Sequence, residues 1–255
     1  MLARVYNSTR VDPKGWYASE KFDGIRAHWC GKEMRTRQGF LINLPKYITS
    51  ILPTNRKLDG ELWFGRNRFE LTGLLRRDFI TAKEMKRQGL KFMVFDIIDE
   101  KMPVEKRQAE LREICKVIRS KSTERVCPVR CVTQTKVKSE EHMKQILAFV
   151  VAKGGEGLML LRPYSRYECK RTNNLLKVKP LTTSQGVVTG YKDGVNGIGS
   201  LAVRFKNVDL FVAGLSNTQK SNAKTMFPIG STLDFSYNEL THKGVPRHPR
   251  LAKTK

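Results

Sequence analysis

KFDGIR, at residues 21–26, is the stretch of this chain that is most informative about its fold and its chemistry. A lysine amine becomes a covalent nucleophile when it is deprotonated and held in line with its target, here a phosphorus atom. A tight turn that contains Gly24 and is flanked by Asp23 and Arg26 is suited to both tasks. A lysine in a polar turn is usually a solvated surface residue, so Lys21 is a candidate nucleophile that needs support from other segments.

Lys177 and Lys179 provide part of that support, because they lie two residues apart in the segment LLKVK at residues 175–179. In a strand, both side chains would face the same side. If they point towards Lys21, their positive charge, together with that of a bound divalent cation, favours the neutral and nucleophilic amine. The alternative is a pair of solvated lysines on an edge strand.

Glu61 and Glu156 are two carboxylates in similar settings, each beside a glycine. In a basic cleft such groups accept hydrogen bonds from ribose hydroxyls or ligate Mg²⁺, which stays partly hydrated and takes few protein ligands. Taken singly, each is more often an ordinary surface acid. Asp59 and Asp23 are expected to brace the turns that position Glu61 and Lys21.

Five motifs follow one another in a compatible order: KFDGIR at 21–26, LDGEL at 58–62, FMVFD at 92–96, EGLM at 156–159 and LLKVK at 175–179. This series resembles that of the ATP-dependent DNA ligases, within the superfamily of nucleotidyltransferases that form a lysyl-nucleotide intermediate. The resemblance runs from about residue 16 to about residue 180 and resumes, more faintly, near the C-terminus. It implies a minimal ligase of the small bacterial or viral type.

The resemblance also implies a role for individual residues. Lys21 would attack the α-phosphate of ATP, with Mg²⁺ or Mn²⁺ as the metal cofactor. Glu61 would lie near the ribose and the metal, and Glu156 near the catalytic metal. The residues implied in nucleotide binding are Glu20, Arg26, Glu61, Phe95, Lys177 and Lys179, of which Phe95 would stack on adenine and the two lysines would contact the α-phosphate. Phe95 otherwise reads as part of a plain core strand.

The resemblance extends to DNA and pyrophosphate. Arg26 would reach the ribose or the nick terminus, and Arg37 would hold the 5′-phosphate of the nick, a task suited to a forked donor. In the C-terminal segment GVPRHPR at residues 244–250, Arg247 would orient the pyrophosphate, and Lys255 would replace the family's second basic residue. His248 stands where the family usually has an aromatic residue.

Composition independently indicates a polyanionic partner. The chain has 48 Lys and Arg against 24 Asp and Glu in 255 residues, a net charge of +24. Residues 1–180 hold 38 basic and 20 acidic side chains, and residues 181–255 hold 10 and 4. Because the charge is spread along the chain, we expect it to cover folded surface rather than a disordered tail.

The fold expected from these patterns is α+β. Apolar stretches at residues 39–44, 57–64 and 90–98 read as strands, and helices are predicted from Pro103 and from Ser139, the second of which should end at Gly154. We expect an adenylation (nucleotidyltransferase) domain of antiparallel sheets flanked by helices over residues 1–182. Alternation of apolar and polar residues then predicts a small all-β OB-fold barrel over residues 183–255.

Two further features set the expected context. No apolar run resembles a signal peptide or a membrane span, so we expect an intracellular, cytoplasmic or nucleoid monomer. Five cysteines are an odd number, which argues against a disulfide framework, and Cys127 with Cys131 is a weak candidate for a metal site.

The connection at residues 192–199 reads as a short hairpin loop, unlike the long insertion that forms a latch around the duplex in some small viral ligases. Grip on DNA should therefore depend on basic surface and be sensitive to salt.

The resemblance thus implies an ATP-dependent enzyme that seals nicks in duplex DNA. The first alternative is an RNA-end ligase or a GTP-using mRNA capping enzyme, which share the lysine motif; the form of the last two motifs, EGLM and LLKVK, argues against capping. The second alternative is a non-enzymatic basic OB-containing nucleic-acid binder, against which the intact set of motif residues stands.

Overall fold

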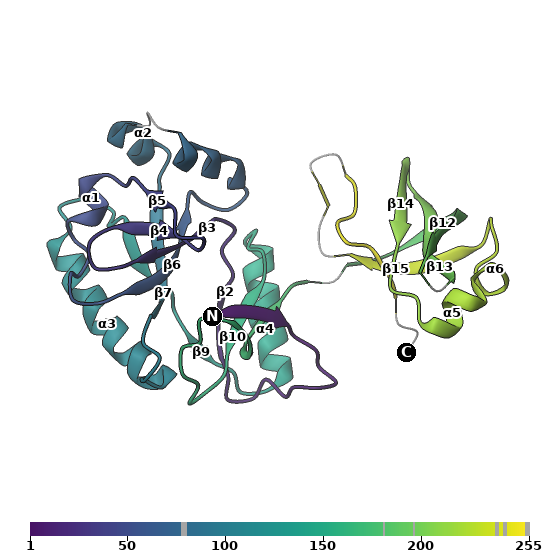
Figure 1. Ribbon diagram of the computed structural model, residues 1–255, viewed down its shortest axis with the longest axis horizontal. Coiled ribbons are helices and arrows are strands. Elements are labelled where there is room, and N and C mark those ends of the chain that lie inside the picture. The colour runs from purple at the N-terminus through teal and green to yellow at the C-terminus, as the bar shows by residue number, and fades with distance from the viewer. Residues whose placement is uncertain (78–80, 181, 196, 238–239, 242–243, 253–255) are drawn as a thin grey trace. The chain divides into compact units, whose positions relative to one another are not determined.

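The computed structural model describes residues 1–255 except 78–80, 181, 196, 238–239, 242–243 and 253–255. The chain separates into two compact units, Met1–Val178 and Lys179–Lys255. The first unit holds two sheets with helices, and the second holds one sheet with two short helices (Figure 1). The expected α+β class and the order of its two parts are confirmed. Among the described residues, no helix is both long and apolar enough to cross a membrane.

Sheet A of the first unit has five strands in the order β1 (Leu2–Val5), β11 (Arg171–Val178), β10 (Leu158–Leu161), β2 (Tyr17–Glu20) and β9 (Thr135–Lys136). Helix α4 (Glu140–Ala152) covers one face, where Met143 and Val150 pack against a buried cluster that includes Leu158 and Leu176. The helix begins as predicted, because Ser139 caps it by accepting a hydrogen bond from the His142 backbone. It is followed by Gly154 at φ 77°, a left-handed conformation suited to glycine.

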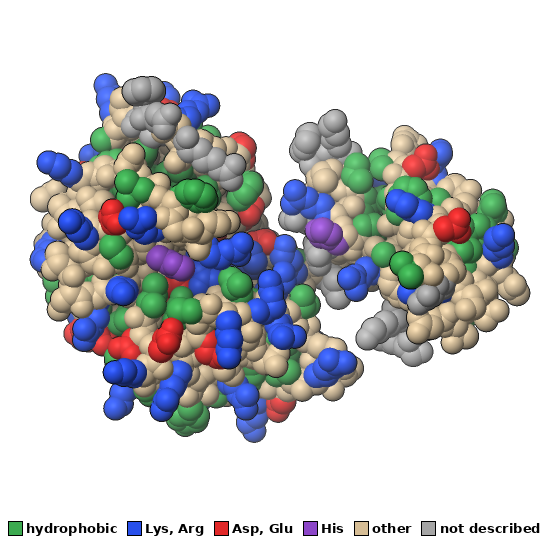
Figure 2. All heavy atoms as spheres, viewed as in Figure 1, with side chains coloured by type: hydrophobic (Ala, Val, Ile, Leu, Met, Phe, Trp, Pro, Cys, Tyr) green, Lys and Arg blue, Asp and Glu red, His purple; other side chains and the backbone are tan. Residues whose placement is uncertain are grey.

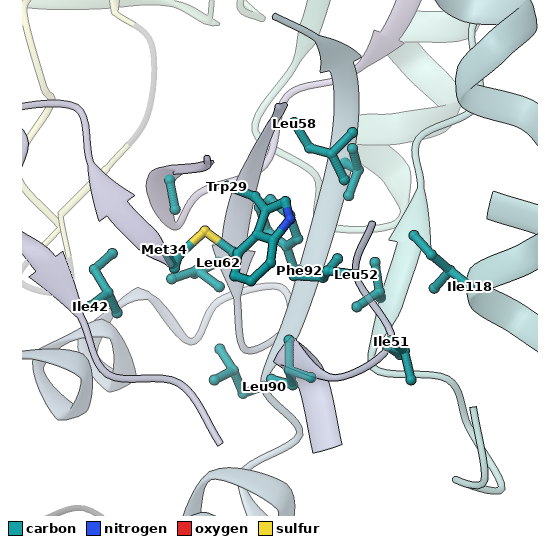
Figure 3. Packing of buried hydrophobic residues seen from close by; sticks show 14 of the residues in the cluster. Trp29, Met34, Ile42, Ile51, Leu52, Leu58, Leu62, Leu90, Phe92 and Ile118 are labelled. Atoms are coloured by element: carbon teal, nitrogen blue, oxygen red, sulfur yellow. The ribbon is translucent and has the colours of Figure 1, made fainter. Parts of the chain in front are cut away.

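Sheet B has six strands in the order β5 (Leu41–Ile42), β4 (Met34–Thr36), β3 (Ile25–Trp29), β6 (Leu58–Trp63), β7 (Lys91–Ile97) and β8 (Val129–Cys131). Three α-helices contribute to its core: α1 (Lys46–Thr49), α2 (Ala82–Arg87) and α3 (Val104–Lys121). A 3₁₀ helix spans Phe69–Arg76. Figure 3 shows the core that these elements bury, with Trp29, Met34 and Phe92 among its large side chains.

Three details differ from the sequence-based expectation. The strand expected at residues 39–44 is only Leu41–Ile42, because Gly39 at φ 92° forms a turn with Thr36. The sheets are mostly antiparallel, but β1 pairs with β11 and β7 pairs with β8 in parallel. Cys115 of α3 and Cys131 of β8 lie side by side, with Cα atoms 6.2 Å apart, a proximity that the odd number of cysteines did not suggest.

A β-bulge interrupts the pairing of β6 with β7. Asp59 pairs with Asp96 and Gly60 pairs with Val94, so Phe95 has no partner residue on β6. A bulge of this kind changes which face of the strand successive side chains reach. In a regular strand, residues an odd number of positions apart face opposite sides. Because of the extra residue, Phe92 and Ile97 nevertheless both enter the core. Phe95 and Asp96, which are neighbours, both lie against a cavity.

The second unit is a five-stranded sheet in the order β14 (Val208–Val212), β13 (Gly197–Phe205), β12 (Thr182–Gly194), β15 (Thr232–Tyr237) and β16 (Arg250–Leu251). Its two edge strands approach each other, since the backbone of Ala213 hydrogen-bonds with Pro249 and Leu251. Helices α5 (Asn217–Ser221) and α6 (Ala223–Met226) follow β14. The predicted hairpin joins β12 and β13, and pairing reaches Gly194 and Gly197, so the connection is shorter than expected.

Candidate active site

A cavity of about 320 Å³ lies in the first unit and is lined by residues of both sheets. Sheet A contributes the side chains opposite its buried cluster, because alternate residues of a strand face opposite sides. They are Ser19, Met159, Leu161, Leu175 and Lys177. The side chains from sheet B are Arg26, Asp59, Glu61, Phe95 and Asp96. The cavity therefore combines apolar surface with groups of both charges.

Lys21, the predicted nucleophile, follows β2 directly and lines this cavity. Its backbone N–H donates to the carbonyl of Gly157, 2.9 Å away, which ties the lysine turn to the segment before β10. Its Nζ forms an ion pair with Oε2 of Glu156, and the two side chains are 25% and 13% exposed. Two residues that are 135 positions apart in the sequence are thus brought together.

The surroundings of Gly24 show why the lysine motif has a glycine at this position. A Cβ at this position would lie 2.3 Å from the carbonyl oxygen of Leu62, a contact that backbone atoms cannot relieve. The absence of a side chain therefore lets the turn lie directly against β6. Since β6 also carries Glu61, this close approach sets the position of Lys21 relative to that carboxylate.

Asp59 is the centre of a buried polar network. It accepts hydrogen bonds from Nε of Arg26 at 3.0 Å and from the Tyr167 hydroxyl at 2.7 Å, and the imidazole of His28 lies 3.2 Å away. Burial alone would raise the pKa of Asp59, but His28 and the charge of Arg26 outweigh it and lower the pKa to about 2. Asp59 was expected to brace the turn near Glu61; here it holds Arg26.

Arg26 is engaged on several sides. Besides Asp59, its guanidinium donates to the backbone carbonyl of Met1 and lies 5.7 Å from the centre of the Phe95 ring. This arrangement fixes the side chain at the wall of the cavity without a ligand. A bound molecule would meet an arginine that is already oriented.

Glu61 faces the same cavity from β6 and accepts a hydrogen bond from the backbone of Gly24. Burial raises the pKa of this carboxyl to about 8, although the charges of Lys21 and Arg26 oppose the shift. An added cation would favour its ionised form.

Among the described residues, no group of three or more His, Cys, Asp or Glu side chains forms a metal site. Cys127 and Cys131, the weak candidates, belong to no such group. Mg²⁺ often takes only one or two carboxylates together with water and substrate phosphates. Glu61 lines the cavity, and Glu156 forms an ion pair with Lys21, which also lines it. These two carboxylates fit that limited set of ligands.

The other predicted site residues lie in different settings. Glu20 lines the cavity, and its carboxylate accepts hydrogen bonds of 3.0 and 2.7 Å from Arg66. Arg37 and Lys177 also line the cavity. Strand β11 ends at Val178, so Lys179 is not on the same strand as Lys177 and belongs to the second unit. Arg247 lies in the second unit, and Lys255 lies outside the described residues.

Sequence reasoning missed two buried supports of the site. Tyr167 is 3% exposed and donates to Asp59, and burial raises its pKa. Arg107 of α3 is completely buried and binds Asp96 through hydrogen bonds of 2.8 and 3.0 Å. Asp96 closes the motif FMVFD, but nothing in the sequence identified an arginine eleven residues later as its partner.

Comparisons with known proteins agree with this arrangement. A family model described as ATP dependent DNA ligase domain matches residues 1–179, and one described as DNA ligase OB-like domain matches residues 193–254. A DNA ligase of Haemophilus influenzae is 31% identical over 252 residues, which cover 97% of this chain and 88% of that protein.

Among solved structures, a Lig E DNA ligase described as binding DNA with a minimal scaffold matches with a TM-score of 0.75 and 28% identity, covering 100% of this chain and 98% of that one. Chlorella virus DNA ligase-adenylate matches with a TM-score of 0.61 and 21% identity, covering 100% and 96%, and supports the fold alone.

Proposed function

Because the chain belongs to the ATP-dependent DNA ligase family, we propose that it seals nicks in duplex DNA with Lys21 as its covalent nucleophile. Its co-substrate is ATP and its substrate is DNA. Nζ of Lys21 attacks the α-phosphorus of ATP, forming a P–N bond as the bond to pyrophosphate breaks. The AMP passes to the 5′-phosphate of the nick, and the 3′-hydroxyl then displaces it to form the phosphodiester bond.

The nucleotide is proposed to occupy the cavity between the sheets. Phe95 and the apolar side chains Met159, Leu161 and Leu175 provide surfaces for the flat base, and Phe95 stacks on it. Lys177 contacts the α-phosphate, and Lys179 supplies a second positive charge. Arg26 and Glu61 contact the ribose. Glu20, whose carboxylate is oriented by Arg66, is the last of the residues assigned to nucleotide binding.

Glu61 and Glu156 are proposed to hold Mg²⁺ or Mn²⁺ together with the phosphates. A bound cation supplies positive charge that stabilises the developing negative charge of phosphoryl transfer. Glu156 also forms the ion pair with Lys21, so the carboxylate holds the amine at the cavity.

DNA contacts are proposed for the basic groups at the cavity margin and beyond it. Arg37, exposed in the turn after β4, is assigned to the 5′-phosphate of the nick, and Arg26 to the nick terminus. Arg247 and Lys255 are assigned to the pyrophosphate. Figure 2 shows Lys and Arg side chains distributed over the visible face of both units, as expected for a protein that binds the DNA backbone. We propose a monomer with its domains at residues 1–182 and 183–255.

The observation that supports this proposal best is the position of Lys21, at a cavity of about 320 Å³ and paired with Glu156. The test is incubation with ATP or GTP labelled at the α-phosphate, followed by denaturing electrophoresis. We expect a labelled band with ATP only. Nicked duplex DNA and nicked RNA then serve as alternative acceptors, and label that passes only to RNA, or arises only from GTP, would contradict the proposal.

A further inference from the structure

Gln134 carries an unsatisfied acceptor at the edge of the nucleotide cavity. The residue lies between β8 and β9 and lines the cavity together with Ser19. Its Oε1 atom is buried and has no hydrogen-bond partner among the residues that the structure describes, although the residue as a whole is partly exposed. Leaving a buried polar atom unpaired costs on the order of 1–3 kcal/mol. An acceptor in this position therefore indicates a donor that arrives with the ligand.

Strand register places Gln134 beside sheet A, immediately before β9. Thr135 pairs with Ala18, so in an antiparallel pair Gln134 comes next to Ser19. Ser19 pairs with Met159, and Met159 pairs with Lys177. Gln134, just before β9, thus continues the row that Ser19, Met159 and Lys177 form across β2, β10 and β11, with Gln134 and Lys177 at its two ends. At roughly 4.8 Å per strand, the backbones of the two ends are about 14 Å apart.

That separation assigns the two ends to different parts of a nucleotide. Lys177 is a cation suited to phosphate, whereas Gln134 is a neutral amide that lies across the apolar Met159 from it. The apolar surface between them is suited to a flat base. A donor that meets Gln134 is therefore expected on the base rather than on the phosphates.

We propose that Gln134 determines base specificity by accepting a hydrogen bond at Oε1 from the exocyclic N6 amine of adenine. This inference rests on the proposed function, since it assumes that ATP occupies the cavity. Guanine carries a carbonyl oxygen at the equivalent ring position, so two acceptors would face each other. A site that hydrogen-bonds an amine discriminates against an analogue without it, because its own polar group is left unpaired.

The experiment compares ATP with purine riboside 5′-triphosphate, which lacks only the amine, in the initial rate of lysyl-nucleotide formation. For the wild-type protein we expect a preference for ATP of roughly tenfold to a hundredfold. Gln134→Met removes the acceptor while keeping a similar shape and should bring the ratio close to one. Gln134→Glu keeps the acceptor but loses the amide N–H, so it should retain the preference even if its overall rate falls.

The inference is overturned if the wild-type protein shows no preference, or if Gln134→Met keeps the wild-type ratio. Equal losses of rate with both triphosphates would likewise overturn it, because they would indicate a purely structural role. A protein that formed no covalent adduct with any purine triphosphate would instead contradict the proposed function. Near-normal ATP labelling with an unchanged ratio in Gln134→Met would contradict only the assignment of Gln134.

Discussion

Sheet A and sheet B meet the same cavity in different ways. The polar side chains of sheet B are bound before any ligand arrives: Arg26 to Asp59, and Asp96 to Arg107 of α3. Sheet A offers apolar surface and Lys177, and the segments that flank its strands supply Lys21 and Glu156. Under the proposed function, sheet B presents side chains that are already held in place, whereas the segments that flank sheet A supply the nucleophile Lys21 and the carboxylate of Glu156.

The largest effect should come from the nucleophile beside sheet A. Lys21→Arg should abolish covalent AMP labelling, because a guanidinium stays protonated and cannot attack phosphorus. Lys144→Arg is the matched control, since Lys144 lies in an exposed ion pair with Glu140 on α4. Denaturing electrophoresis after incubation with α-labelled ATP measures both. If the Lys21→Arg protein still became labelled, Lys21 would not be the nucleophile, and the chemical role assigned to the segments beside sheet A would be wrong.

Glu156→Ala should lower nick sealing on the order of a thousandfold, since a metal-positioning carboxylate is worth several kcal/mol of transition-state stabilisation. The fold should persist, because Glu156 belongs to neither of the buried clusters of the two sheets. Glu140→Ala, the partner of the control above, should seal at the wild-type rate. Steady-state sealing rates and thermal melting curves test both statements, and near-normal turnover would return Glu156 to an ordinary surface role.

Asp59→Ala tests sheet B and should act on stability first. Removing this carboxylate leaves the guanidinium of Arg26 without its charge partner in a buried setting, which costs about 3–5 kcal/mol in the free energy of unfolding. The control is Asp209→Ala, which breaks the exposed pair with Arg204 and should cost less than about 1 kcal/mol. Denaturant unfolding measures both. Equal losses would mean that sheet B is not braced by its buried network.

The smallest expected effect concerns Arg37, beyond β4 at the edge of sheet B. Arg37→Ala should spare lysyl-AMP formation and slow the nick-dependent steps roughly tenfold to a hundredfold, the loss of one charge-assisted contact. Arg247→Ala should do the reverse, because pyrophosphate is absent when pre-adenylated DNA is closed. Single-turnover assays of each step separate the two variants. Equal defects in every step would mean that both arginines serve only folding or general DNA affinity.

Much of the scaffold could be predicted because its signals are local. The helices at Val104–Lys121 and Glu140–Ala152 and the strands at Leu58–Trp63 and Lys91–Ile97 are confirmed, since periodicity and capping residues are visible in sequence. Strand β9 is only two residues long and has no such signal. The position of Gln134, directly before β9, could therefore not be predicted from the sequence.

The site was predicted unevenly for a related reason. The motifs singled out Lys21 and Glu156 separately, and the structure pairs them. Tyr167 and Arg107 could not be found this way, because a buried tyrosine or arginine is recognised only by the tertiary partner that satisfies it. The nucleotide roles of Lys177, Lys179 and Arg247 remain predictions.

Phe95 provides the aromatic wall of the cavity, yet it has no pairing partner on β6. The ring is therefore not needed for the regular pairing of the sheet. Asp59 and Gly60 already pair with Asp96 and Val94, so a strand shortened by this one residue would keep a regular ladder with the same partners. Loss of a single codon would therefore remove the ring and leave the buried core in phase, whereas most other deletions in β7 would turn core side chains outward. If Phe95 stacks on a base as proposed, a change in length at this position would therefore alter nucleotide binding more than it alters the fold.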